Sequence, residues 1–268
     1  MLKIGPGKRI SISRWIDRKT PALDMASRKT LTCRADQKVS DVSTVFSKRF
    51  RRLPVAGKDG VLRGMLTAYD VLAFLYTGRR APKGPKSGAK VKDIMTTCPN
   101  TIDSKATMEE ALDIFKKKRK GGYPVVRKGK VEGILTESDI IRKIDGKTGV
   151  KVRDAMVRKP LVVQLHHTVD EVARMLVMGG FRRLPVVEKG ELRGLVTTRD
   201  ILGLKKGKTK SPVEDVMQKD VHAVDTELDV YGVIRVMKEK NIGGFPVLEE
   251  GRLAGIITER DIIDACEF

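Results

Sequence analysis

This chain contains few aromatic residues, few cysteines and few histidines. Phe, Trp and Tyr together make up 4% of its 268 residues, and cysteine and histidine each occur three times. The low aromatic content disfavours nucleic-acid recognition by base stacking. The cysteines and histidines do not have the spacing of a disulfide framework or a metal site. Their positions are Cys33, Cys98, Cys266, His166, His167 and His222. Because no nucleophile–base pair emerges either, we expect no metal site and no catalytic residue.

Long apolar runs are also absent. A membrane-spanning helix needs about 20 consecutive apolar residues, and no stretch of this sequence approaches that length. The first 21 residues, MLKIGPGKRISISRWIDRKTP, are basic but lack the apolar region of a secretory signal. We expect a soluble, cytoplasmic protein with no membrane partner.

Acidic residues are scarce in the first half of the chain. The whole chain carries 54 Lys+Arg and 34 Asp+Glu, a formal charge of +20. Residues 1–150 hold 34 basic and 15 acidic residues (+19), whereas residues 151–268 hold 20 and 19 (+1). The excess fits either a solvated, self-repelling surface or an anionic partner such as nucleic acid, polyphosphate or an acidic protein.

The sequence contains four copies of one unit. Each copy has a strand-like core with a proline: RRLPV (51–55), GGYPV (121–125), RRLPV (182–186) and GGFPV (243–247). Each is followed by a Gly-x-x-Thr-x-x-Asp motif, at 64–70, 133–139, 194–200 and 255–261. A methionine lies 29 residues before each core proline, with an aspartate one or two residues earlier; these are Met25, Met95, Met156 and Met217. Four such matches establish a tandem repeat.

Each copy predicts a β-α-β-β-α unit. In the second copy, Met108, Ala111, Leu112 and Phe115 form one apolar stripe of a helix over 107–119. A three-stranded sheet with helices on one face cannot cover itself, so the copies should pair. We therefore predict an α+β fold with a basic N-terminal segment (1–22), repeat 1 (23–78), a basic Gly/Pro linker (79–92), repeat 2 (93–145), repeat 3 (152–206) and repeat 4 (213–268).

The Thr-x-x-Asp motif allows two interpretations. It is a helix capping box, in which the Thr hydroxyl and the Asp carboxylate each bind a backbone amide of the first turn. It also suits a nucleoside site, where the carboxylate accepts two ribose hydroxyls and the Thr hydroxyl faces an anion. One isolated copy favours the cap, whereas four identical pairs favour the site. Both roles can coexist, and the candidate residues are Thr67, Asp70, Thr136, Asp139, Thr197, Asp200, Thr258 and Asp261.

The pair of residues before the core strand differs between copies. Repeats 1 and 3 have Arg51-Arg52 and Arg182-Arg183, whereas repeats 2 and 4 have the glycine pairs 121–122 and 243–244. A guanidinium offers a permanently charged fork to phosphate, and glycine permits close backbone approach. The arginines are therefore phosphate candidates, with a solvated pair as the alternative.

Together these motifs resemble the CBS domain, over about residues 23–268. The resemblance implies four CBS repeats paired into two pseudo-two-fold Bateman modules, similar to free-standing archaeal four-CBS proteins and to the gamma subunit of AMP-activated protein kinase. It implies that the aspartates hold ribose hydroxyls and the threonines phosphate or ribose. It further implies that Arg52 and Arg183, two before the proline, bind phosphate, although no copy has the His often found beside that Arg.

The implied function is non-enzymatic sensing of adenosine-containing ligands in clefts between paired repeats. The expected ligands are AMP, ADP or ATP, with S-adenosylmethionine or NAD as the second choice. No cofactor is required. Occupancy would be transmitted to an unknown regulated protein. IMP dehydrogenase carries a CBS pair, but its barrel needs about 250 further residues, for which the repeats leave no room. The two clefts of a module should differ, with the first module preferring more highly charged ligands. The alternative function is nucleic-acid binding by the basic residues of 1–150. The sequence is compatible with either a monomer or a homodimer.

Overall fold

The computed structural model of this chain describes residues 8–48, 50–78, 88–204 and 208–268. Within these ranges no helix is both long enough and apolar enough to cross a membrane. Most of the predicted linker, residues 79–87, lies outside the described residues, as do residues 1–7 of the N-terminal segment and residues 205–206 of repeat 3. The rest forms helices and small sheets, an α+β fold as predicted.

Repeat 2 shows the predicted unit most clearly. Strand β5 (Ile102–Asp103) runs parallel to β6 (Gly122–Arg127), and β6 runs antiparallel to β7 (Lys130–Thr136). Helix α5 (Met108–Lys118) lies between Thr107 at its N-cap and Arg119 at its C-cap, and all four residues of the predicted stripe are buried. Helix α6 (Glu137–Ile141) follows β7 directly. The periodicity therefore predicted both the helix and its buried face.

The other repeats use the same order with small changes. Repeat 1 has α2 (Val39–Lys48), β2 (Arg52–Ala56), β3 (Leu62–Thr67) and α3 (Ala68–Thr77), with a bridge from Cys33 to Val55 in place of a first strand. Repeat 3 has β9 (Val163–Gln164), α8 (Val169–Gly179), β10 (Arg183–Glu188), β11 (Glu191–Thr197) and α9 (Thr198–Leu202). Repeat 4 has β12 (Val224–Asp225), α10 (Val230–Lys240), β13 (Gly244–Glu249), β14 (Arg252–Thr258) and α11 (Glu259–Ala265). A short helix η2 (Lys208–Lys210) precedes repeat 4.

The segment that opens each repeat joins the sheet of a neighbouring repeat. We call these the lead segments: α1 (Ala22–Met25) to Ser27, α4 (Val91–Ile94) to β4 (Thr96–Thr97), α7 (Val152–Ala155) to β8 (Val157–Arg158), and η3 (Val213–Asp215) to Gln218. The lead of repeat 2 pairs with β3 of repeat 1, and that of repeat 1 bridges β7 of repeat 2. In the same way, the lead of repeat 3 pairs with β14 of repeat 4, and the lead of repeat 4 bridges β11 of repeat 3. The four repeats are therefore paired into two modules.

A glycine of each receiving strand accommodates the incoming lead. A Cβ on Gly255 would lie 2.7 Å from both Met156 Sδ and the Val157 carbonyl oxygen. Gly64 is covered by Met95 in the same way, but Gly133 faces Ala26 and Ser27 instead. Met25 is thus one residue out of register, although the sequence placed it at the same repeat position as the other methionines.

We expect Gly255→Ala to destabilise the chain by about 1–3 kcal/mol, because the Val157 carbonyl that the new methyl group would meet belongs to a paired strand and cannot move aside. Urea unfolding measures the change. Gly88→Ala is the matched control, since nothing lies within 4 Å of a Cβ there. Equal stability of the two variants would contradict this account of the lead.

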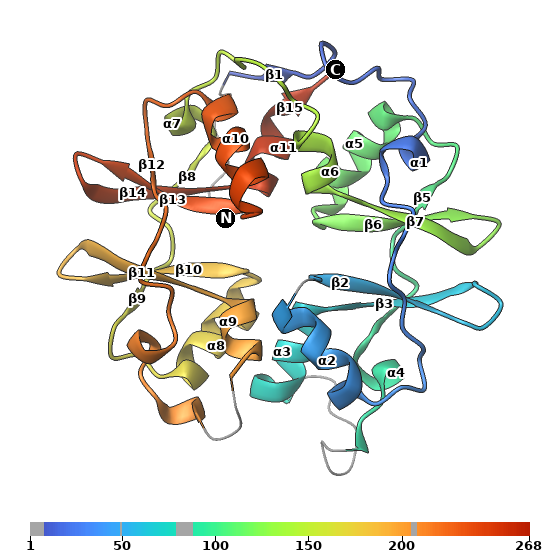
Figure 1. Ribbon diagram of the computed structural model, residues 1–268, viewed down its shortest axis with the longest axis horizontal. Coiled ribbons are helices and arrows are strands. Elements are labelled where there is room, and N and C mark those ends of the chain that lie inside the picture. Colours follow the sequence, from blue (N-terminus) through green and yellow to red (C-terminus); the bar gives the residue numbers. More distant parts are fainter. Residues whose placement is uncertain (1–7, 49, 79–87, 205–207) are drawn as a thin grey trace. The chain divides into compact units, whose positions relative to one another are not determined.

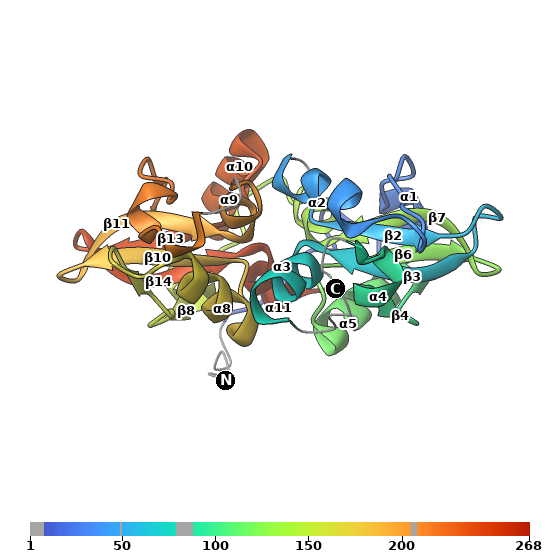
Figure 2. The same cartoon turned by 90° about the horizontal axis from the view of Figure 1, so that it is seen from below.

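The chain divides into two compact units that join alternate repeats. Unit 1 contains residues up to 29, 100–160 and 222–268, and so most of repeats 2 and 4. Unit 2 contains residues 30–99 and 161–221, and so most of repeats 1 and 3. Helices α6 and α11 pack together in unit 1 (Figure 1), and α3 packs on α8 in unit 2 (Figure 2), where the Tyr69 hydroxyl donates to the Val177 carbonyl at 2.7 Å. The repeat pattern does not predict these helix contacts.

The N-terminal segment is part of unit 1. Strand β1 (Ile10–Ser11) pairs in parallel with β15 (Cys266–Glu267), so two segments far apart in the sequence lie side by side (Figure 1). Ile10, Ile12 and Ile16 are buried in the core of repeats 2 and 4, and Trp15 packs against this core. The segment lies outside the repeats in sequence but contributes to their packing.

The predicted linker extends too far at its C-terminal end. Ala89 and Val91 are buried, and α4 begins at Val91, with the Asp93 carboxylate accepting from the Lys90 amide at 2.7 Å. The lysines around them suggested an exposed loop, but the two apolar side chains point into the core of repeat 1. Residues 88–92 therefore belong to the folded part of the chain.

Candidate functional site

All four Thr-x-x-Asp motifs lie where a strand meets a helix. Each Thr ends a strand and caps the next helix, at α3, α6, α9 and α11. In each motif the Thr amide and the Thr hydroxyl both donate to one carboxylate oxygen, Oδ2 of the Asp, at 2.6–2.9 Å. The capping-box interpretation is therefore confirmed at every motif.

Capping engages only one oxygen of the carboxylate. In repeats 2 and 4, Oδ1 of Asp139 and of Asp261 accepts no hydrogen bond from the described residues. An ionised carboxylate oxygen can accept more than one donor. The cap thus leaves acceptor capacity for a ligand hydroxyl, and the two interpretations of the motif are compatible.

Strand register brings the second motif to the first. Arg52 lies directly opposite Thr67 in the β2–β3 pair, and Arg183 lies opposite Thr197 in β10–β11. Both arginines, like Arg51 and Arg182 beside them, are half-buried. The guanidinium candidates and the Thr-Asp pair of repeats 1 and 3 therefore belong to the same strand–helix junction, 14 to 19 residues apart in sequence.

Glycine takes the arginine position in the other two repeats. Gly122 lies opposite Thr136, and Gly244 lies opposite Thr258. A Cβ on Gly244 would lie 2.8 Å from the Ile257 carbonyl oxygen and 2.9 Å from Cγ2 of Thr258. Repeat 4 cannot accept an arginine here without a backbone shift, so its glycine has a packing reason. All four arginine candidates fall in unit 2.

The junction of repeat 4 buries its carboxylate. Asp261 is 5% exposed, and burial raises the pKa of its carboxyl from 3.8 to about 6, against the lowering effect of the hydrogen bonds from Thr258. The nearby carboxylates of Asp264 and Glu137 add to the rise. Burial also raises the pKa of Asp139 in repeat 2.

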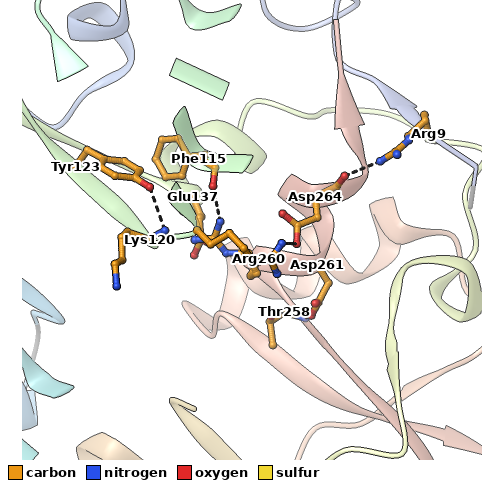
Figure 3. Close-up of polar contacts among 10 residues, drawn as sticks. Arg9, Phe115, Lys120, Tyr123, Glu137, Thr258, Arg260, Asp261 and Asp264 are labelled. Atoms are coloured by element: carbon orange, nitrogen blue, oxygen red, sulfur yellow. Dashed lines mark hydrogen bonds and ion pairs between the residues drawn. The ribbon is translucent and has the colours of Figure 1, made fainter. Parts of the chain in front are cut away.

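An arginine from the same motif neutralises part of this acidic region. Arg260 Nη2 lies 2.5 Å from Oε1 of Glu137, which is fully buried at the start of α6, and Arg260 Nη1 donates to the Phe115 carbonyl at 2.8 Å (Figure 3). Arg119 pairs with Asp264 at 2.9 Å. These contacts join α5, α6 and α11 within unit 1. Sequence analysis gave no role to the residues between Thr and Asp, because they differ between copies.

In repeat 3 a side chain from the lead of repeat 4 reaches the aspartate. Gln218 Nε2 donates to Oδ1 of Asp200 at 3.0 Å and to Oδ2 at 3.2 Å. This contact was not predicted either. The lead position varies in residue type from copy to copy, so the repeat pattern carries no signal for it.

The positive charge is shared by the two units. Unit 2 contains 25 Lys+Arg and 13 Asp+Glu (+12), and unit 1 contains 29 and 21 (+8). The excess that the sequence places in residues 1–150 is thus divided between both. Among the described residues no group of three or more His, Cys, Asp or Glu side chains could hold a metal ion.

Comparisons with known proteins agree with the repeat pattern. The CBS domain model matches four times, over residues 22–77, 91–146, 152–207 and 213–267. Protein MJ1225 of Methanocaldococcus jannaschii is 29% identical over 249 residues, covering 82% of this chain and 89% of that protein. Its crystal structure, described as that of a proposed archaeal homologue of γ-AMPK, covers 91% of this chain with a TM-score of 0.84 and 27% identity. An uncharacterised 33.4 kDa protein of Thermofilum pendens is 28% identical over 256 residues, 85% of each chain.

Similarity to an enzyme is confined to part of that enzyme. Inosine-5'-monophosphate dehydrogenase of Thermoplasma acidophilum is 32% identical over 134 residues, 49% of this chain but 26% of the enzyme. Most of that enzyme therefore lies outside the match. The family model, in contrast, covers most of this chain in four consecutive matches. This chain belongs to the CBS domain family and consists largely of four CBS domains.

Proposed function

We propose that this protein is a non-enzymatic sensor that binds adenosine-containing ligands at its Thr-Asp junctions, with AMP, ADP or ATP preferred over S-adenosylmethionine or NAD. The observation that carries the proposal is the register of the two motifs. It sets a phosphate candidate opposite the threonine of a ribose candidate pair, in Arg52 with Thr67 and in Arg183 with Thr197. Membership of the CBS family supports the same class of ligand.

The two kinds of junction suit different parts of a ligand. At repeats 1 and 3, Arg52 and Arg183, with Arg51 and Arg182 beside them, would pair with phosphate oxygens. At repeats 2 and 4, glycine replaces the guanidinium, and the aspartates Asp139 and Asp261 would hold the ribose with the threonines Thr136 and Thr258. We therefore expect the phosphate group to contribute most to binding at repeats 1 and 3.

The lead segments provide a route from ligand to partner. Each junction lies at the end of a strand that carries the lead of the paired repeat. A ligand that binds one position of the lead better than another shifts the population between them. A regulated protein, whose identity the fold does not indicate, would recognise that shift.

AMP and ATP are expected to stabilise the chain against thermal unfolding, by about 2.7 kcal/mol at 100 times the dissociation constant.

The series Asp70→Ala, Asp139→Ala, Asp200→Ala and Asp261→Ala should remove one binding site each in calorimetric titration. Arg52→Gln and Arg183→Gln should weaken AMP about tenfold and leave adenosine unchanged, because only the phosphate contact is lost. If AMP, ATP and S-adenosylmethionine all fail to bind, the proposal is wrong and the motifs are helix caps alone.

A further inference from the structure

We propose that Gln218 is a built-in competitor for the ligand at repeat 3, and that the junction of repeat 3 is therefore gated by the lead of repeat 4. The inference rests on the proposed function, since it concerns the same carboxylate. Both oxygens of Asp200 already have donors: Oδ2 accepts from the Thr197 amide and hydroxyl at 2.7 Å each, and Oδ1 accepts from Gln218 Nε2 at 3.0 Å. In repeats 2 and 4 the described residues leave Oδ1 of the aspartate without a donor.

The chemistry of the contact resembles that of the expected ligand. A primary amide carries two N–H donors on one nitrogen, and a ribose carries two neighbouring hydroxyl donors. Either group satisfies the carboxylate, so they cannot both bind Asp200 Oδ1 and Oδ2 in the same way. A ribose that takes both oxygens in this way displaces the Gln218 amide, so ligand binding at repeat 3 costs the two hydrogen bonds of Gln218.

The backbone holds Gln218 at this position. Its amide donates to the Leu195 carbonyl at 2.9 Å, and its carbonyl accepts from the Leu195 amide at 3.0 Å. Leu195 lies in β11, which ends at Thr197 of the same junction. The side chain itself is exposed, so it is free to rotate into solvent when a ligand arrives. A fixed backbone with a movable side chain is what a gate requires.

The other repeats provide natural controls. Positions equivalent to Gln218, judged by their pairing with the receiving strand, are Ser27, Thr96 and Val157. Val157 has no polar side-chain atom, and Ser27 and Thr96 have short hydroxyl side chains. Gln218 alone combines an amide with the length of two methylene groups. The gate is thus specific to repeat 3 of this chain.

Site-resolved NMR titration of the full-length 15N-labelled chain with AMP tests this gate. The amide signals of Asp70, Asp139, Asp200 and Asp261 report the four junctions separately. We expect Gln218→Ala to raise the affinity reported by Asp200 about three- to tenfold, the effect of removing one exposed hydrogen bond to a charged group. Gln218→Val, which copies the lead residue of repeat 3, should do the same. The affinity reported by Asp70 should stay unchanged.

The results distinguish failure of the gate from failure of the proposed function. Tighter binding at Asp200 in both variants supports the gate, whether or not the wild-type junction binds AMP detectably. Unchanged or weaker binding at Asp200, with normal binding at the other junctions, overturns the gate while the proposed function stands. If none of the four aspartate signals responds to AMP, the proposed function fails and the gate fails with it. Gln218→Met, which keeps the side-chain length but has no N–H donor and no charge, should also abolish the competition, and it separates loss of the donor from loss of side-chain volume.

Discussion

Replacing Asp261 by Asn is expected to stabilise this protein at neutral pH while removing the ligand site of repeat 4. The carboxyl of Asp261 is buried, and its pKa in the folded chain is about 6 against an ordinary value of 3.8. The folded state therefore binds this proton more tightly than the unfolded state does. Stability from this group is greatest below about pH 4, declines as the pH rises to about 6, and stays at its lower value above that.

The size of the effect follows from the two pKa values. A difference of this size corresponds to about 3 kcal/mol of unfolding free energy between pH 3.5 and pH 7.5. Asn is neutral throughout and can still accept from the Thr258 amide and hydroxyl, which now bind Asp261 at 2.8 and 2.6 Å. Between pH 3.5 and pH 7.5 we therefore expect the unfolding free energy of Asp261→Asn to rise by about 3 kcal/mol relative to that of the wild type. The variant should bind no ribose at repeat 4.

Urea unfolding followed by tryptophan fluorescence measures this change. Trp15 is the single tryptophan and packs on the core that contains Ile262 and Ile263, so its signal reports unit 1. Asp220→Asn, at an exposed position, controls for the loss of one negative charge. Parallel pH profiles for wild type and Asp261→Asn would show that the carboxylate is not buried as described. A confirmed gain would mean that Asp261 is retained at the expense of stability, as expected of a functional residue.

The second large effect is expected at Arg260. Its guanidinium pairs with Glu137, which is 0% exposed. Arg260→Met keeps much of the side-chain volume but leaves the Glu137 carboxylate buried beside the Asp261 carboxyl without its nearest cation. Breaking a buried pair from one side typically destabilises by about 3–5 kcal/mol, because an uncompensated charge stays inside. We expect a loss of this size for unit 1, read from Trp15 fluorescence in urea.

A double variant distinguishes the pair from simple packing. Arg260→Met with Glu137→Gln removes both charges and should recover most of the lost stability, since the Glu137 carboxylate that depended on Arg260 is then gone. Arg28→Met is the matched control: Arg28 pairs with Asp24 at 2.9 Å, but both side chains are more than half exposed, and the loss should stay below about 1 kcal/mol. Equal losses at Arg28 and Arg260, or no recovery in the double variant, would contradict the role assigned to the buried pair.

Much of the fold and of the candidate site could be predicted from the sequence. The helix over 107–119, the strands that contain the four prolines and the Thr-x-x-Asp helix starts all depend on residues close together along the chain. Apolar periodicity and capping act over a few residues, so one sequence suffices to recognise them. Repetition then turned four weak local signals into a family assignment, which the comparisons confirm.

Tertiary structure decided the contacts between residues that are distant in sequence. The lead of repeat 1 engages repeat 2 through Ala26 and Ser27 rather than Met25, a register that the aligned methionines concealed. Gln218 meets Asp200, Arg260 of repeat 4 meets Glu137 of repeat 2, and β1 meets β15. Such pairs depend on how sheets and helices pack, which periodicity does not specify. Local patterns therefore reveal which chemical groups each repeat carries, whereas packing brings in the residues of other repeats that contact each site.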